Sequence, residues 1–105
     1  MEVYFPQRHE PVYRGCLSWI IEEFTQLRGG CTVHSNVDGY YLSRSNEVID
    51  DRVSVIYSDF PLDWDDDSDQ IEVLSYCATL KDFLYENLSE EKILISAYPV
   101  SHFRE

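Results

Sequence analysis

The chain has few basic residues, and this shortage excludes a class of partner. Only eight of its 105 residues are lysine or arginine, against 20 aspartates and glutamates, so the formal net charge is -12. Proteins bind nucleic acids and anionic membranes through clustered lysine and arginine side chains that displace counterions. The few bases here are scattered along the chain, so we predict no binding to nucleic acid or membrane. A basic protein partner is compatible with this charge.

Cysteine is also scarce. The three residues Cys16, Cys31 and Cys77 are an odd number, are widely spaced and form no CxxC pair. This pattern argues against a disulfide framework and against a zinc ribbon. The first ten residues lack the basic start and long apolar run of a signal peptide, and no apolar run in the sequence is long enough to cross a bilayer. We therefore expect a cytoplasmic protein with reduced thiols.

Motifs that would name a reaction are missing from the sequence. It contains no GxxxxGK[ST], no GxGxxG and no GxSxG. The acidic run 63–69 does not fit a calcium loop, because Ser68 stands where glycine is needed and Leu74 where glutamate is needed. We expect a solvated loop in which Asp69 and Glu72 cap the following helix. The sequence predicts no cofactor and no bound metal.

Residues 29–41, GGCTVHSNVDGYY, place a cysteine and a histidine three positions apart. A thiolate nucleophile needs its base within hydrogen-bonding reach. In a strand, residues of opposite parity point to opposite faces, so we expect Cys31 to face the core and His34 to face away. The other histidines, His9 and His102, are not predicted to converge with His34. We predict no catalytic residues and favour a protein without enzymatic activity.

Apolar and aromatic residues are plentiful and periodic. They make up 44% and 14% of the chain respectively, which predicts one folded domain covering residues 1–105. Apolar stripes at helical spacing and alternating apolar runs define the expected elements. These are a strand at 2–7, a helix at 15–28, hairpin arms at 31–42 and 48–57 around a turn at 43–46, a helix at 69–88 and a strand at 92–103.

This order, β-α-β-β-α-β, predicts the α+β class. The economical packing is the ferredoxin-like one, a four-stranded antiparallel sheet with two helices on one face. Pro99 favours it, because proline lacks a donor for the strand ladder and belongs on an edge strand, where the last strand of this fold lies. The alternative is a cystatin-like or another α+β sheet. We expect Gly39 to mark a bulge or bend in the first hairpin arm.

The succession GGCTV, DGYYL, VIDDRVSVIY, a helix and EKILIS resembles a group of small uncharacterised bacterial ferredoxin-like proteins. The resemblance extends from Trp19 to Val100. It implies the fold and no catalytic activity. Ser45-Asn46 stand where a turn containing glycine would be more usual.

The sheet face away from the helices is the most informative predicted surface. Strand parity places Tyr4, Ser54, Leu94 and Val100 there among other residues, which is too apolar for a face in contact only with water. Tyrosine and arginine are favoured at interfaces, and Trp19, opposite its helix's apolar stripe, indicates another contact. The candidate ligand or interface residues are His34, Tyr40, Arg52, Ile56, Tyr98, His102 and Trp19.

Three functions are compatible with these features. The first is a non-enzymatic self-associating or protein-interaction module, most simply a homodimer, that uses this sheet face. The second is a small-molecule-binding protein or enzyme with a pocket lined by histidine and tyrosine on the same face. The third is an acidic nucleic-acid mimic that binds a basic partner, because residues 47–69 hold nine acids and only one base, Arg52.

Overall fold

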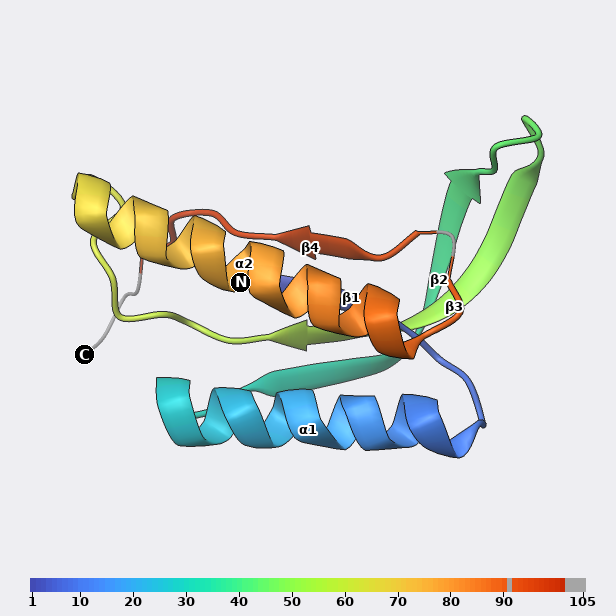
Figure 1. Cartoon of the computed structure of the whole chain (residues 1–105), viewed down its shortest axis with the longest axis horizontal. Coiled ribbons are helices and arrows are strands. Elements are labelled where there is room, and N and C mark those ends of the chain that lie inside the picture. Colours follow the sequence, from blue (N-terminus) through green and yellow to red (C-terminus); the bar gives the residue numbers. More distant parts are fainter. Residues whose placement is uncertain (91, 102–105) are drawn as a thin grey trace.

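The computed structural model describes residues 1–90 and 92–101 of the chain. It contains four strands and two helices in the order β-α-β-β-α-β (Figure 1). The expected α+β class is therefore confirmed. The elements are β1 (Glu2–Pro6), α1 (Pro11–Arg28), β2 (Thr32–Leu42), β3 (Val48–Tyr57), α2 (Asp67–Asn87) and β4 (Leu94–Ser96).

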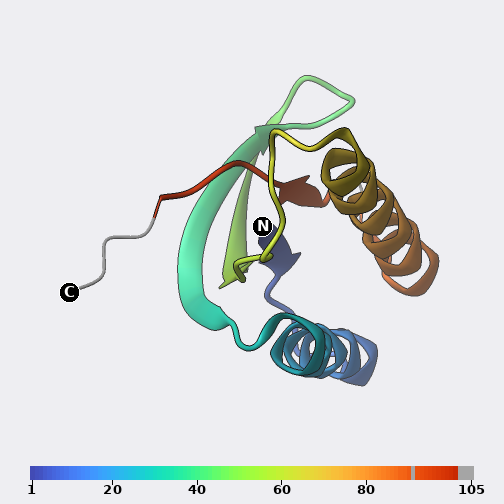
Figure 2. The same ribbon diagram turned by 90° about the vertical axis from the view of Figure 1, so that its left-hand side faces the viewer.

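The strands form one antiparallel sheet in the order β2-β3-β1-β4. Figure 2 shows both helices on the same side of this sheet, and no helix covers the other side, which we call the bare side. The last strand lies at an edge, as expected, but it ends at Ser96, so Pro99 lies beyond it. The reason is the length of its partner: Ser96 pairs with Glu2, and β1 begins there.

The helix ends follow from local chemistry. Helix α1 begins at Pro11, earlier than expected, because proline fits the first helical position, where no N–H donor is needed. Gly29 ends it with a φ of 89°, in the left-handed conformation that glycine accepts. The N-cap of α2 is Asp66, whose carboxylate accepts a 3.0 Å hydrogen bond from the Asp69 amide. The expectation that Asp69 caps the helix is wrong, because it lies in the first turn.

The core lies between the sheet and the two helices. Ile56 is 0% exposed and pairs with the equally buried Val3, while Ser54 pairs with the buried Phe5. Ile56 and Ser54 therefore face the helices, and their expected place on the bare face is wrong. Alternation alone did not decide which side of β3 is inside; its register against β1 does. The largest fully buried side chains are Phe5, Phe24, Ile20, Ile56 and Leu84.

The β2–β3 hairpin has the predicted turn at 43–46, where the Asn46 amide donates to the Ser43 carbonyl at 3.0 Å and Asn46 has a φ of 63°. Its irregularity lies between His34 and Val37, where Asn36 has a φ of 60°. The expected bulge at Gly39 is wrong. Asparagine is one of the few residues with a side chain that tolerate this left-handed conformation, so the extra residue is accommodated at Asn36.

Beyond the bulge the hairpin turns sharply and projects past the end of α2 (Figure 1), in keeping with the bend and added twist that a bulge produces. The extra residue also changes which side chains share a face. Tyr40 pairs with Asp50, and Leu42 pairs with Val48, on the side that continues the helix-covered face. Neither helix reaches this part of the hairpin, so Tyr40, Leu42 and Val48 are exposed. Tyr40 therefore does not lie on the bare face as expected.

Candidate functional site

The bare side of the sheet is the first candidate surface. We call it the open face, and its central row runs across all four strands through directly paired residues. Both ends of the row are exposed, and its middle is half-buried. An apolar and aromatic surface of this kind, uncovered in a single chain, is typical of a contact site. The row consists of His34, Val55, Tyr4 and Leu94, flanked on β3 by Val53 and Tyr57.

Tyrosine hydroxyls and carboxylates are paired at one end of the open face. Glu2 accepts hydrogen bonds from Tyr98 at 2.6 Å and from Tyr4 at 2.7 Å, and these two bonds lower its pKa. The Tyr57 hydroxyl donates to Asp59, and this bond raises the pKa of Tyr57 to about 12. These phenols are therefore protonated at neutral pH, so they present fixed polar groups rather than a general base.

Of the seven residues expected at the site, two lie on the open face, namely His34 and Tyr98. Arg52 pairs with Asp38 across the hairpin at 3.2 Å, on the same side as the exposed Tyr40, so its expected place on the open face is also wrong. The expected position of His102 falls outside the described residues.

Trp19 already has a neighbour within the chain. Its ring centroid lies 4.5 Å from that of Phe83, so helix α2 covers part of it. Its remaining exposed surface is 41% of the residue, which is compatible with a further contact.

Val53, Val55 and Tyr57 lie on the open face, in the place where strand parity predicts Arg52, Ser54 and Ile56. Their side is fixed by the register of β3 against β1, which no local pattern in the sequence shows.

The cysteine and histidine of the GGCTVHSNVDGYY segment lie apart, as expected. Cys31 packs against the core with its sulfur 3.9 Å from the Ile21 carbonyl, while His34 is exposed on the open face. Burial raises the pKa of Cys16 and of Cys77, which makes both thiols poor nucleophiles at neutral pH. Within residues 1–90 and 92–101, no group of three or more histidine, cysteine, aspartate or glutamate side chains is placed to hold a metal ion.

A partly buried ionic cluster joins the hairpin to the rest of the molecule. Arg8 lies 2.8 Å from Asp51 on β3 and 3.3 Å from Glu90, which follows α2, and the Tyr13 hydroxyl of α1 donates to Glu90 at 2.5 Å. We call these four residues the Arg8 cluster. The side chains of Arg8, Asp51 and Glu90 are 31%, 13% and 8% exposed. No local pattern predicts this cluster, because Arg8 and Glu90 are 82 positions apart.

Burial, followed by the hydrogen bond to Glu90, raises the pKa of Tyr13 to about 12. The bond to Asp51 is the largest cause of the raised pKa of Arg8. Each charge in the cluster thus has a partner, and the cluster links four segments of the chain.

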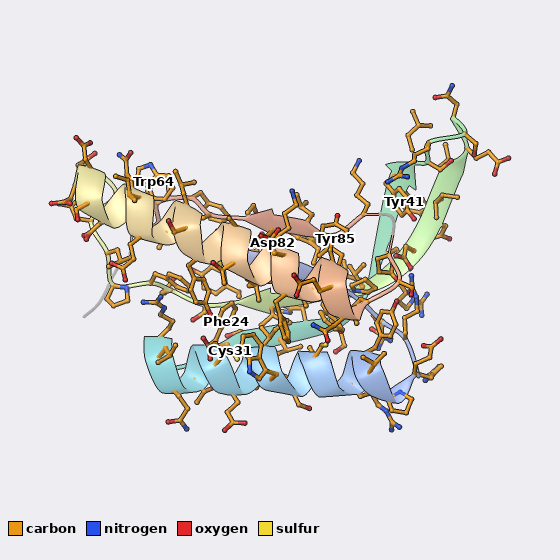
Figure 3. The ribbon with its side chains drawn as sticks, in the orientation of Figure 1. Phe24, Cys31, Tyr41, Trp64, Asp82 and Tyr85 are labelled. Atoms are coloured by element: carbon orange, nitrogen blue, oxygen red, sulfur yellow. The ribbon has the colours of Figure 1, made fainter. Side chains whose placement is uncertain are left out.

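A cavity of about 580 Å³ lies between the loop that follows β3 and the segment that follows β4. Its walls include Phe60, Leu62, Trp64, Ala97 and Tyr98. Of the predicted site residues that the structure describes, Tyr98 alone lines it, so this is not the pocket expected at the centre of the open face. Figure 3 shows Trp64 beside the first turn of α2.

Comparisons with models of protein families, with curated proteins and with solved structures found no match. No helix in the described part of the chain is long and apolar enough to cross a membrane. The fold, the open face and the cavity are therefore the basis for a proposal about function.

Proposed function

We propose that this protein is a non-enzymatic self-associating module, a homodimer in which the open faces of two copies pack against each other. The observation that carries the proposal is the uncovered row of His34, Val55, Tyr4 and Leu94, which crosses all four strands. Two sheets pack face to face through such rows at a separation of about 10 Å.

We also propose that the fold is the ferredoxin-like one. The strand order β2-β3-β1-β4, the chain order β-α-β-β-α-β and the placement of both helices on one side support it. In that arrangement the helices leave one whole face of the sheet without cover. The open face is thus a direct product of the topology.

The low charge of the open face itself is compatible with a second copy as its occupant, although each chain carries a net charge of -12. The acids near the face are engaged within the chain: Glu2 by Tyr4 and Tyr98, and Asp59 by Tyr57. The acidic stretch 63–69 lies instead where α2 begins, on the side of the helices. Two identical surfaces of low charge meet readily about a two-fold axis, which is the commonest symmetry of oligomers.

Sedimentation velocity tests this proposal. The wild-type chain is expected to sediment as a dimer of 12.4 kDa subunits at micromolar concentration. Leu94→Asp places a charge on a side chain that is 55% exposed at the edge of the open face, and it is expected to give a monomer. Because added salt screens the repulsion between acidic chains, it is expected to strengthen the wild-type dimer.

Val48→Asp is the matched control. Val48 is 73% exposed on the opposite side of the projecting hairpin, so this variant gains the same charge and is expected to remain dimeric. Far-ultraviolet circular dichroism checks that both variants are folded. If the wild-type chain is still a monomer at a protein concentration 100-fold above micromolar, self-association is refuted. If Val48→Asp dissociates the dimer and Leu94→Asp does not, the subunits contact each other through the hairpin and not through the open face.

A further inference from the structure

We propose that the cavity beside Trp64 is a binding site for a small organic cation, an ammonium group carried on an apolar body. Of its wall residues, Tyr98 also lies on the open face, but the ligand is placed at Asp63, Asp65 and Trp64, so the proposal does not rest on self-association. The proposal combines three properties of the cavity, namely its size, its aromatic walls and the sign of its charged groups.

The size and walls of the cavity suit a small molecule. Its volume of about 580 Å³ lies within the roughly 300–1,000 Å³ that ligand pockets occupy. Most of the surrounding side chains are apolar, and three of them, Phe60, Trp64 and Tyr98, are aromatic. Aromatic rings attract a cation over their faces and also bury the apolar part of a ligand.

The charges around the cavity favour a cation over an anion. Asp59, Asp63 and Asp65 line it. One oxygen of Asp63 accepts a hydrogen bond from the Asp65 amide, and Asp63 and Asp65 are both exposed. An anion would meet three carboxylates here in a chain of net charge -12, whereas an ammonium group would meet hydrogen-bond acceptors of opposite sign.

The two cations that line the cavity are already engaged. The Arg28 guanidinium carbon lies 4.0 Å from the centre of the Phe60 ring and 5.1 Å from that of Tyr76, and the Arg28 Nε is buried without a hydrogen-bond partner among the described residues. The Met1 ammonium donates to the Ser58 carbonyl at 2.8 Å.

The chain's own Arg28 thus already uses Phe60 as a surface for a cation. Asp59 acts electrostatically on the Met1 ammonium and accepts a hydrogen bond from Tyr57, whereas Asp63 and Asp65 line the cavity as exposed carboxylates. We place the ligand's ammonium group at Asp63 and Asp65, and its apolar body against Trp64.

Tryptophan fluorescence tests the proposal, because Trp64 lines the cavity and the chain has only one other tryptophan, Trp19. The Trp19→Phe variant isolates the signal of Trp64. Phenethylamine is the probe, with 3-phenylpropionate and 2-phenylethanol as anionic and neutral molecules of similar size. A saturable change with phenethylamine is expected, with binding at least about tenfold weaker for the other two probes.

The Asp63→Asn/Asp65→Asn double variant keeps the oxygen that accepts from the Asp65 amide and removes both charges. It is expected to weaken phenethylamine binding about tenfold. The control is Asp82→Asn/Glu86→Gln, which removes two exposed charges further along α2 (Figure 3 labels Trp64 and Asp82) and is expected to bind normally.

In the wild-type chain, NMR of the Trp64 indole N–H gives the same readout without any substitution. No saturable response to phenethylamine in either measurement would overturn the proposal. So would equal binding of all three probes, or an equal loss of binding in the two double variants.

Discussion

Replacing Arg8 with methionine should weaken the Arg8 cluster, which joins the hairpin to the rest of the protein. Methionine keeps most of the apolar stem of arginine and removes its charge. The Asp51 and Glu90 carboxylates, which are 13% and 8% exposed, then lose their cationic partner. Removing one partner of a fully buried pair costs about 3–5 kcal/mol. Because Arg8 itself is 31% exposed, we expect a smaller loss, about 2–3 kcal/mol of the free energy of unfolding.

Urea unfolding at neutral pH, followed by tryptophan fluorescence, measures this loss. With a slope of about 1–1.5 kcal/mol per molar urea, the midpoint is expected to fall by about 2 M. The matched control is Arg14→Met, an exposed arginine on α1, for which a change within about 0.5 kcal/mol is expected. Measurements at two protein concentrations separate this effect from any dissociation of subunits.

A double-mutant cycle shows whether the Arg8 cluster acts as a unit. Glu90→Gln keeps an acceptor for the Tyr13 hydroxyl while it removes the charge that Arg8 pairs with. If the pair is coupled, the Arg8→Met/Glu90→Gln variant should be more stable than the sum of the single losses predicts, by about 1 kcal/mol or more. Losses that add within error, or an Arg8→Met variant as stable as Arg14→Met, would refute this reasoning.

Two further predictions concern the bulge and the tyrosines. Asn36→Val is expected to cost about 2 kcal/mol in urea unfolding, because valine resists a φ of 60° and lacks the side-chain oxygen that accepts from Gln7. Asn36→Gly lacks the same oxygen but accepts this backbone, so it should cost less; equal losses would contradict the assigned strain. Folding raises the pKa of Tyr13, Tyr57 and Tyr76 to about 12, so their contribution to stability is complete below pH 10 and is lost as the pH rises from 10 to 12. Tyrosinate absorbance should therefore show these three titrating later in the folded chain than in urea, and a single transition near pH 10 in both states would contradict the structure.

The elements with local causes were predictable from the sequence. The apolar stripes of both helices, Gly29 after α1 and the turn at 43–46 act through neighbouring residues, and the structure has all of them. The bulge was misplaced because its position is fixed from outside the strand. The side-chain amide of Gln7, 29 residues away, accepts from the Asn36 amide and donates to the Asn36 side chain, both at 2.8 Å.

The errors at the site follow from missing long-range information. Strand parity predicts the wrong face for Tyr40, because alternation along β2 is interrupted by the bulge. It predicts the wrong face for Arg52 and Ile56, because the register of β3 against β1 decides which side of β3 faces the core. The Arg8 cluster was missed for a similar reason, since its members come from four separate segments. These four residues come together only in the folded chain.

The bulge and the Arg8 cluster together make the projecting hairpin a lever. Asn36 and Arg8 hold it at its base, one through Gln7 and the other through Asp51, while its tip touches neither helix. At about 3.3 Å per residue, the turn stands roughly 25 Å from the bulge, so a rotation of about 10° at the base moves the tip by roughly 4 Å. A small change in the packing of Asn36 and Arg8 at the base would therefore displace the tip by more than the length of a hydrogen bond.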